Sequence, residues 1–311
     1  MTTTKQVRAD FRLLGSCHGE SELNPYNQAR GGPTSLMTLS GSTLPDYVRP
    51  PVVEVVFAAS LRPLPISLVD LARFGWERLG DSFPIRQEQP PMPVAIETFD
   101  DATRNLAPTL ALLTGVPPVR LWFQSEDKTR LVQVQRDWLA CNWQGLSGDG
   151  TYPRYESIES LFLETFDSFA DYAAQLGYGQ VGTAQCELSY INHIAPGELW
   201  ERHGQLSKVV RLASDTDDFL PEPEDGQLVF RYRIPYEGKD VGRLYVQVTP
   251  GLRPLDRSPL IQLNMVARGA PLREGREGMV SFFRLAHEWI VRGFAAVTTE
   301  AAQDILWERI K

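Results

Sequence analysis

The sequence contains few cysteines, and they form no recognisable site. Cys17, Cys141 and Cys186 are the three cysteines among 311 residues, and no Cys-x-x-Cys pair occurs. Widely spaced cysteines in odd number support neither a zinc ribbon nor a disulfide framework. The sequence therefore predicts no metal site, and thiols that stay reduced fit a cytoplasmic protein.

Long hydrophobic runs are also lacking. The most apolar stretch, residues 107–116, is too short to span a bilayer and contains Pro108. Residues 1–8 hold no apolar segment of the kind that a secretory signal needs. We expect a soluble protein that has no membrane partner.

Positive charge is not in excess either. The 31 lysines and arginines are outnumbered by 39 acidic residues, which gives a net charge of −8. Proteins that bind nucleic acid usually present a basic surface, so the acidic net charge disfavours nucleic-acid binding. A local stripe of basic residues would still permit it. The sequence has no Walker A loop and no strand-linked Gly-x-Gly-x-x-Gly, and we expect no cofactor.

What the sequence does contain is a set of strand-like segments with one polar side. Residues 130–136, 243–248 and 259–265 alternate aliphatic side chains with glutamine, arginine or asparagine. Side chains alternate across a strand, so each segment sends its polar side chains one way and its aliphatic side chains the other. This pattern predicts a sheet with one dry face and one polar, hydrogen-bonding face, where a partner could bind.

Apolar side chains at helical spacing predict helices that cover the dry face. The clearest helix follows a capping Ser157 and ends at Gly177. Phe166 lies on its apolar stripe, and each fully buried large apolar side chain contributes about 1.5–3 kcal/mol, so we expect Phe166→Asp to unfold the unit. The predicted strands are 50–58, 93–99, 119–124, 129–138, 184–194, 227–234, 242–249 and 259–267, and the predicted helices are 67–79, 158–176, 277–297 and a short terminal helix to residue 310.

These elements predict an α+β protein with two meandering, mostly antiparallel sheet units, each covered by long amphipathic helices. Residues 1–46 are expected to form a flexible N-terminal extension, 47–213 the first unit and 214–311 the second. In both halves, meandering strands precede a long aromatic-rich helix. This parallel suggests an internal duplication, although two unrelated α+β units would look much the same.

Three glutamates within predicted strands are the leading candidates for chemistry. Glu54, Glu97 and Glu187 lie among apolar neighbours, where a carboxylate must be paired or exposed. On one surface they would form an acid/base or metal-binding cluster, with arginines as counterions. The competing interpretation, which we favour, is a solvated sheet face with structural Glu–Arg pairs. The expected counterions are Arg120, Arg136, Arg231 and Arg233.

Three further candidates are better explained structurally. His193 shares the strand face of Glu187, and His287 lies mid-helix without the second histidine of a His-Glu-x-x-His zinc motif. Cys17 stands at the centre of a Gly-x-Cys-x-Gly pattern, but the strand and helix that flank a nucleophile elbow are missing there. We interpret both histidines as structural and expect Cys17 not to be catalytic.

Aromatic residues crowd the stretch 121–156. Interleaved with arginines, they would form a stacking surface for bases or a peptide. Aromatic residues more often pack in cores or on edge strands, and the acidic net charge favours that interpretation. The aromatic residues are Trp122, Trp138, Trp143, Tyr152 and Tyr155, and the arginines are Arg120, Arg136 and Arg154.

Several motifs in a fixed order resemble a known family. Pro-Pro-x-x-Glu-Val-x-Phe stands at 50–57, Gln-x-Gln at 133–135, Asn-Trp at 142–143, Tyr-Pro-Arg-Tyr-Glu at 152–156 and Gln-Cys-Glu at 185–187. Together they resemble a sporadically distributed family of bacterial proteins of unknown function, over about residues 48–310. The family brings no assigned activity or catalytic residues. Its patchy distribution implies horizontal transfer, as for defence islands and toxin–antitoxin loci.

Since no catalytic motif is present, we predict a non-enzymatic binding or regulatory protein that recognises a protein or peptide partner through the polar sheet face. A bacterial antiviral defence or toxin–antitoxin setting follows from the resemblance, and self-association is compatible with it. The alternatives are an enzyme or small-ligand binder with a Glu/Arg/His-lined cleft, and a nucleic-acid sensor. The predicted binding face consists of Glu54, Glu97, Gln133, Gln135, Arg136, Arg154, Glu187, His193, Gln247 and Gln262.

Overall fold

The computed structural model describes residues 43–99, 119–145, 151–211, 213, 219–253 and 256–310. Its contacts divide the chain into residues 1–38 and residues 39–311, and every described residue belongs to the second part. Except for residues 43–46, the expected N-terminal extension lies outside the described residues, and so does the pattern around Cys17.

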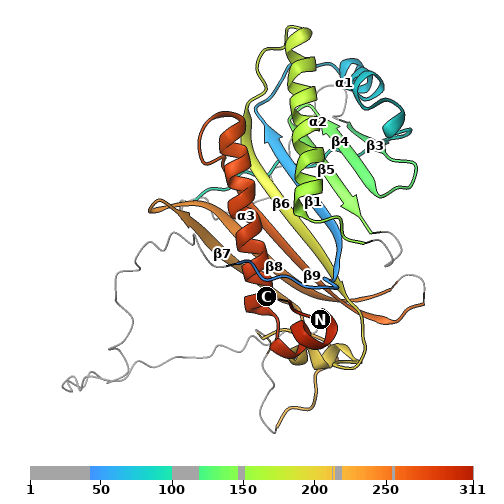
Figure 1. The fold of residues 1–311 in the computed structure, drawn as a ribbon, viewed down its shortest axis with the longest axis vertical. Helices are drawn as coiled ribbons and strands as arrows, with labels where there is room; N and C mark the ends of the chain where they lie inside the picture. Colours follow the sequence, from blue (N-terminus) through green and yellow to red (C-terminus); the bar gives the residue numbers. More distant parts are fainter. Residues whose placement is uncertain are drawn as a thin grey trace, which may run out of the picture. The chain divides into compact units, whose positions relative to one another are not determined.

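Within the described residues, nine strands form one antiparallel sheet in the order β2-β3-β4-β5-β1-β6-β9-β8-β7, and Figure 1 shows how this sheet lies against the helices. β1 and β6 are the central pair, with Phe57 opposite Leu188. The strands are β1 (Val52–Leu61), β2 (Ile85–Gln89), β3 (Arg120–Gln124), β4 (Arg130–Gln135), β5 (Trp138–Gln144), β6 (Thr183–Ile194), β7 (Leu228–Tyr236), β8 (Lys239–Leu252) and β9 (Pro259–Gly269).

Two long helices, α2 (Tyr155–Gln175) and α3 (Gly275–Val297), cover one face of this sheet (Figure 1). Phe57 of β1 meets both, with its ring centroid 5.9 Å from Phe162 and 5.0 Å from Phe283. All three rings are fully buried. The dry face of the sheet therefore packs against the apolar stripes of the two helices.

A shorter helix, α1 (Leu68–Phe74), begins where the sequence predicts it. The Ser67 hydroxyl accepts a hydrogen bond from the Asp70 N–H at 3.0 Å and caps the helix. The chain continues through a π-helical turn, Gly75–Leu79. A Cβ on Gly75 would lie 1.9 Å from the ring of Phe123, so glycine is what lets this turn approach β3. Other short helical turns are Gly80–Ser82, His203–Lys208 and Ala302–Leu306.

Helix α3 rests on a pair of facing glycines. Gly242 of β8 is opposite Gly269 of β9. A Cβ on Gly269 would meet the Val241 carbonyl oxygen at 2.2 Å and the Phe282 ring at 2.5 Å. Because neither glycine has a side chain, the Phe282 ring packs directly on the backbone of the sheet. This contact sets the distance between α3 and the end of β9.

The fold is α+β, as predicted, but the two separate sheet units expected from the sequence are not observed. β6 pairs with β9 from Cys186–Gly269 to Ile194–Ile261, and this ladder joins the strands of both halves into one sheet. Alternation along single strands carries no information about such pairing between distant segments. The sequence also gave no signal for β2, whose residues Ile-Arg-Gln-Glu-Gln lack a run of β-branched side chains.

Candidate functional site

The strand register places most of the predicted binding residues on one side of the sheet. Val55 and Phe57 are fully buried beneath the helices, so Glu54 and its alternate neighbours face the opposite way. We call this opposite side the polar face. It carries the predicted residues Glu54, Gln133, Gln135, Glu187, His193, Gln247 and Gln262, together with Arg120, Asn142, Gln144, Gln185, Arg243, Tyr245, Asn264 and Arg268.

Side chains form a hydrogen-bonded row across four strands of the polar face. Arg120 Nη1 donates to Gln133 Oε1 at 3.0 Å, and Gln133 Nε2 donates to Asn142 Oδ1 at 2.7 Å. Asn142 Nδ2 and Gln144 Nε2 both donate to Glu54 Oε1, at 2.6 and 3.0 Å. The donors lead across the sheet from β3 to β5 and end at one carboxylate on β1, so the row holds these side chains in fixed orientations.

A segment of the chain itself crosses the polar face. β2 and β3 are neighbouring antiparallel strands, yet residues 90–119 separate them, whereas such connections usually take about 2–5 residues. We call the described first part, residues 90–99, the strap. The sequence predicts a strand over 93–99, but the strap pairs with none of the described strands. Three of its first four residues are prolines, which lack the N–H donor that a strand ladder needs.

One glutamine and an apolar patch hold the first half of the strap. Gln135 Nε2 donates to the Met92 carbonyl, and Gln135 Oε1 accepts from the Met92 N–H, both at 2.9 Å. Val94 packs on a small cluster that includes Ala58 and Trp138. The side-chain amide thus makes the same pair of bonds to a main chain that a neighbouring strand would make.

Charged and polar side chains hold Glu97 at the other end of the strap. Its carboxylate accepts hydrogen bonds from Arg243 Nη1, from Arg268 Nη1 at 3.4 Å and from the Tyr245 hydroxyl at 2.7 Å. The Glu97 side chain is only 5% exposed. Its N–H donates to Gln185 Oε1 at 3.2 Å. A carboxylate that is so deeply buried requires hydrogen-bond donors and counterions. Of the contacts that hold the strap, those of Glu97 therefore depend most on the matching side chains of the sheet.

Arg243 and Arg268 connect this contact to the rest of the site. Arg243 Nη2 donates to the Thr98 carbonyl at 2.7 Å, and its guanidinium lies 4.6 Å from the centroid of the Phe99 ring. Arg268 Nε donates to Glu187 Oε2 at 2.6 Å. Burial opposes the charge of Arg268, but the neighbouring carboxylates of Glu187 and Glu97 outweigh it and raise its pKa.

Three predicted binding residues lie away from the strands of the polar face. Glu97 reaches that face from the strap instead of from a strand. Arg136 is exposed in the turn between β4 and β5. Arg154 precedes α2 on the helix side of the sheet and pairs with Asp46 at 2.8 Å. The expectation that these three belong to a strand-borne face is therefore corrected.

The counterions of the glutamates also differ from those expected. Arg243 and Arg268, not Arg136, pair with Glu97 and Glu187. The sequence offers one cue for them, since both stand at polar positions of alternating strands, but their partners lie 81 to 171 residues away.

The aromatic residues of 121–156 do not form one stacking surface. Trp138 packs under Val94 on the polar face. Trp143 and Tyr152 lie on the helix side, with ring centroids 5.6 Å apart, and Tyr155 packs 5.3 Å from Phe57. The sheet itself separates the two groups, so they cannot stack on the same ligand.

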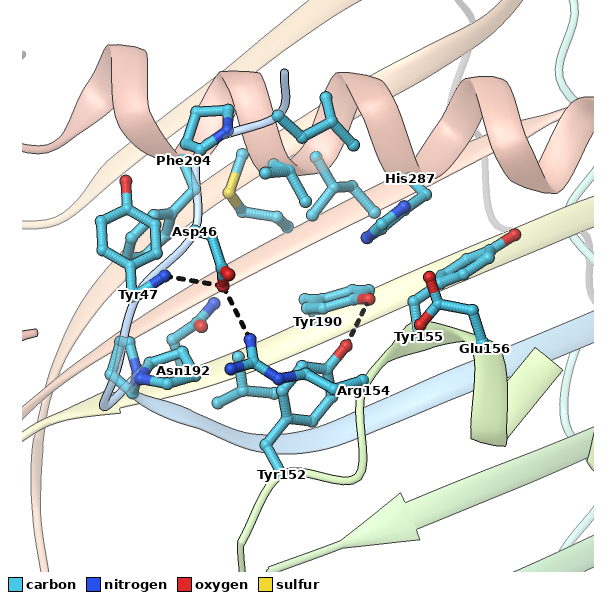
Figure 2. A pocket seen from close by; sticks show the side chains of 18 of the residues that line it. Asp46, Tyr47, Tyr152, Arg154, Tyr155, Glu156, Tyr190, Asn192, His287 and Phe294 are labelled. Atoms are coloured by element: carbon cyan, nitrogen blue, oxygen red, sulfur yellow. Dashed lines mark hydrogen bonds and ion pairs between the residues drawn. The ribbon is translucent and has the colours of Figure 1, made fainter. Parts of the chain in front are cut away.

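A cavity of about 590 Å³ lies on the helix side, between residues 43–52 and the helices α2 and α3 (Figure 2). The Tyr152 and Tyr190 hydroxyls are 2.8 Å apart in its wall. The His287 ring stacks on Tyr155 with centroids 4.0 Å apart. Burial raises the pKa of Tyr152 to about 12 and lowers that of His287 to about 4, so both are uncharged at neutral pH.

Other kinds of site find little support in the described part of the chain. There, no three His, Cys, Asp or Glu side chains gather as a metal ion would require. Cys141 and Cys186 are buried, and burial raises the pKa of the Cys141 thiol to about 12, which leaves it unreactive. None of the described helices has both the length and the apolarity needed to cross a membrane.

Comparison with known proteins gives no further assignment. No protein-family model matches the sequence, and no curated protein matches it. The resemblance to a sporadically distributed bacterial family therefore stays a prediction.

Proposed function

We propose that the polar face binds an extended segment of a protein partner, which takes the place of the strap. The observation that carries this proposal is the strap itself. The face already holds a peptide segment, through Gln135 at the main chain of Met92 and through Arg243 and Arg268 at the side chain of Glu97. A surface that recognises main-chain groups and one acidic side chain has the properties of a peptide-binding site.

The contacts of the strap define the chemistry of the partner. An aliphatic side chain stands where Val94 packs, a glutamate follows three residues later, and an aromatic ring stands two residues after the glutamate, as Phe99 does. Proline before the aliphatic position suits the segment, because it favours an extended chain and lowers the entropy lost on binding. The proposed partner motif is aliphatic-x-x-Glu-x-aromatic.

The contacts that hold the strap allow a partner segment to replace it. Among the described residues, no main-chain to main-chain hydrogen bond joins the strap to a strand. Every polar contact described for residues 90–99 involves a side chain. A competing segment can therefore replace these contacts one at a time without opening the sheet ladder.

The same geometry favours binding over catalysis. Glu97 and Glu187 are paired with arginines, and Glu54 accepts two amide donors. None of these carboxylates lines the cavity of about 590 Å³, which lies on the other side of the sheet. A function in which the polar side chains position a bound segment accounts for their contacts.

A peptide added in trans tests the proposal. In the full chain, residues 90–99 are replaced by a Gly/Ser segment of equal length, and a fluorescent peptide with the sequence of residues 90–99 is titrated by fluorescence anisotropy. We expect binding that weakens about tenfold or more, or about 1.4 kcal/mol, when the peptide carries Glu97→Gln or the chain carries Arg243→Gln. Arg136→Gln, in an exposed turn, is the matched control and should leave the affinity unchanged.

Two results would overturn the proposal. One is an absence of binding by a Gly/Ser chain that still unfolds cooperatively. The other is binding that ignores both substitutions. If the Gly/Ser chain does not fold, the peptide is titrated instead against a chain that keeps residues 90–99 but carries Glu97→Gln. The strap of that chain has lost its ion pairs with Arg243 and Arg268. If single-stranded nucleic acid binds better than the peptide, with a steep dependence on salt, the face is a nucleic-acid surface instead.

We also infer an internal duplication from the order of the elements. In each half a central strand is followed by a three-strand meander and a long helix, and the last meander strand pairs with the central strand. The first half uses β1, β3–β5 and α2, and the second uses β6, β7–β9 and α3. On this view the strap is an addition to the first half, because it lies before that half's meander.

A further inference from the structure

The cavity on the helix side has the features of a small-molecule site, separate from the polar face. Its volume of about 590 Å³ falls within the range of about 300–1,000 Å³ found for ligand pockets. Side chains from six parts of the chain meet there: residues 43–47, the start of β1, the start of α2, β6, β9 and α3 (Figure 2). A space built from so many segments is held open by the fold as a whole.

Aromatic rings form much of its wall. Tyr190 lies across the centre of the site in Figure 2, with the His287 ring 6.1 Å away at an angle of 26°. His287 in turn stacks on Tyr155 at 4.0 Å and 17°. Phe294, Met265 and Ile290 add apolar surface. Nearly parallel rings bordering an open space favour a flat aromatic ligand.

The wall also offers hydrogen-bonding groups that the protein leaves unused. His287 has no hydrogen-bond partner among the described residues, so its neutral ring presents one donor and one acceptor nitrogen. The Tyr152 and Tyr190 hydroxyls share one hydrogen bond, which leaves the proton of the second hydroxyl free. A ligand with a hydroxyl or N–H on its ring edge would satisfy these groups.

The charged side chains of the wall limit the charge of the ligand that the cavity can bind. Among the described residues of the wall, Arg154 is the one arginine or lysine, and it is already paired with Asp46 at 2.8 Å; Asp46 and Glu156 both line the site. An anionic ligand would therefore meet two carboxylates there and an arginine that is already paired. A neutral molecule fits this balance.

We propose that this cavity binds a neutral, planar aromatic molecule that carries a hydroxyl or ring N–H, with His287 and the Tyr152–Tyr190 pair recognising that polar edge. The site uses none of the side chains of the polar face. Ligand binding in the cavity can therefore be tested independently of peptide binding at the polar face.

Methionine methyl groups provide the test. The full chain has five methionines, of which Met265 lines the cavity, Met279 is buried elsewhere and Met92 belongs to the strap. The chain is labelled with ¹³C at the methionine methyl groups, and phenol, toluene and benzoate are titrated in turn by NMR. Phenol carries the polar edge, toluene lacks it, and benzoate is anionic. Met265→Leu assigns the reporting signal.

We expect phenol to shift the Met265 signal saturably at millimolar concentration, which is weak binding suited to a fragment. The Met279 and Met92 signals should stay in place. Toluene should bind about tenfold more weakly and benzoate not measurably. His287→Phe and Tyr152→Phe should each reduce phenol binding toward the level of toluene, since they remove the polar partner and keep the ring.

Several outcomes would overturn this proposal. They are a Met265 signal that no probe moves, equal affinity for phenol and toluene, and His287→Phe binding phenol as the unaltered chain does. An unchanged Met279 signal shows that each variant is still folded. If His287→Phe does not fold, His287→Gln, which keeps polarity but loses the ring, should weaken phenol and toluene alike.

Discussion

Gln135 holds Met92 at both hydrogen-bonding groups of its backbone, with both donor–acceptor distances at 2.9 Å. Gln135 Nε2 also donates to Asp137 Oδ1 at 2.7 Å. Because a carboxylate accepts but does not donate, Asp137 fixes which end of the amide carries the donor. The side-chain amide of Gln135 is therefore oriented to bind a main chain in one direction, and the proposed peptide binding depends on this orientation.

Gln135→Glu should loosen the strap without unfolding the sheet. The new carboxylate keeps the acceptor for the Met92 N–H, loses the donor to the Met92 carbonyl and repels Asp137. We expect hydrogen exchange of the segment 90–99, followed by mass spectrometry, to become about tenfold faster, as a loss of about 1.4 kcal/mol would produce. Gln124→Glu, at a half-buried position of β3 that does not contact the strap, is the matched substitution and should leave this exchange unchanged.

Glu97 and Arg243 should be energetically coupled. Glu97→Gln leaves two arginines without their shared carboxylate, and we expect it to lower the free energy of unfolding by about 2–4 kcal/mol. Urea unfolding of Glu97→Gln, Arg243→Gln and the double variant gives the coupling, expected at about 1–3 kcal/mol. Purely additive effects would show that the ion pair does not hold the strap.

Gly269→Ala should destabilise the protein by about 2–3 kcal/mol, because the added Cβ collides with the Val241 carbonyl and the Phe282 ring. Gly251→Ala is the control in the same sheet, since the Cβ there meets its nearest neighbour, the Leu260 carbonyl, at an ordinary 3.7 Å. Thermal unfolding compares the two. If both variants melt together, α3 does not depend on the glycine pair for its place on the sheet.

His287 should make stability fall on acidification. Burial lowers the pKa of His287 to about 4 from its ordinary 6.5, with Glu156 opposing the shift. The unfolded chain therefore takes up the proton first, and stability is lost as the pH falls from about 6.5 to 4. Between pH 7 and pH 5 the loss from this residue is about 2 kcal/mol. Urea unfolding of His287→Phe at both pH values should show a loss smaller by about that amount, whereas an equal loss would contradict the shift.

The polar face was predictable because alternation is a local property. Gln133, Gln247 and Gln262 each stand between aliphatic neighbours in alternating segments, and that period of two alone places them on one side of their strands. The long helices were predictable for the same reason, from the 3.6-residue period of their apolar side chains. These signals need no knowledge of what lies opposite.

The strap and the single sheet were not predictable in this way. Val94 and Ile96 give residues 93–99 the composition of a strand, whereas the strap is held through Met92 by Gln135 and through Glu97 by Arg243, which lie far away in the sequence. The ladder between β6 and β9 likewise depends on a pairing between distant segments. The cavity combines side chains from six parts of the chain, none of which has a pattern of its own.

Selection from a random peptide library is the sharpest test of peptide binding by the polar face. The full chain with residues 90–99 replaced by a Gly/Ser segment is the target, and the same chain with Arg243→Gln and Arg268→Gln is the counter-target. We expect enrichment of aliphatic-x-x-Glu-x-aromatic sequences on the target and their loss on the counter-target. Enrichment of unrelated sequences, or equal enrichment on both chains, would contradict it.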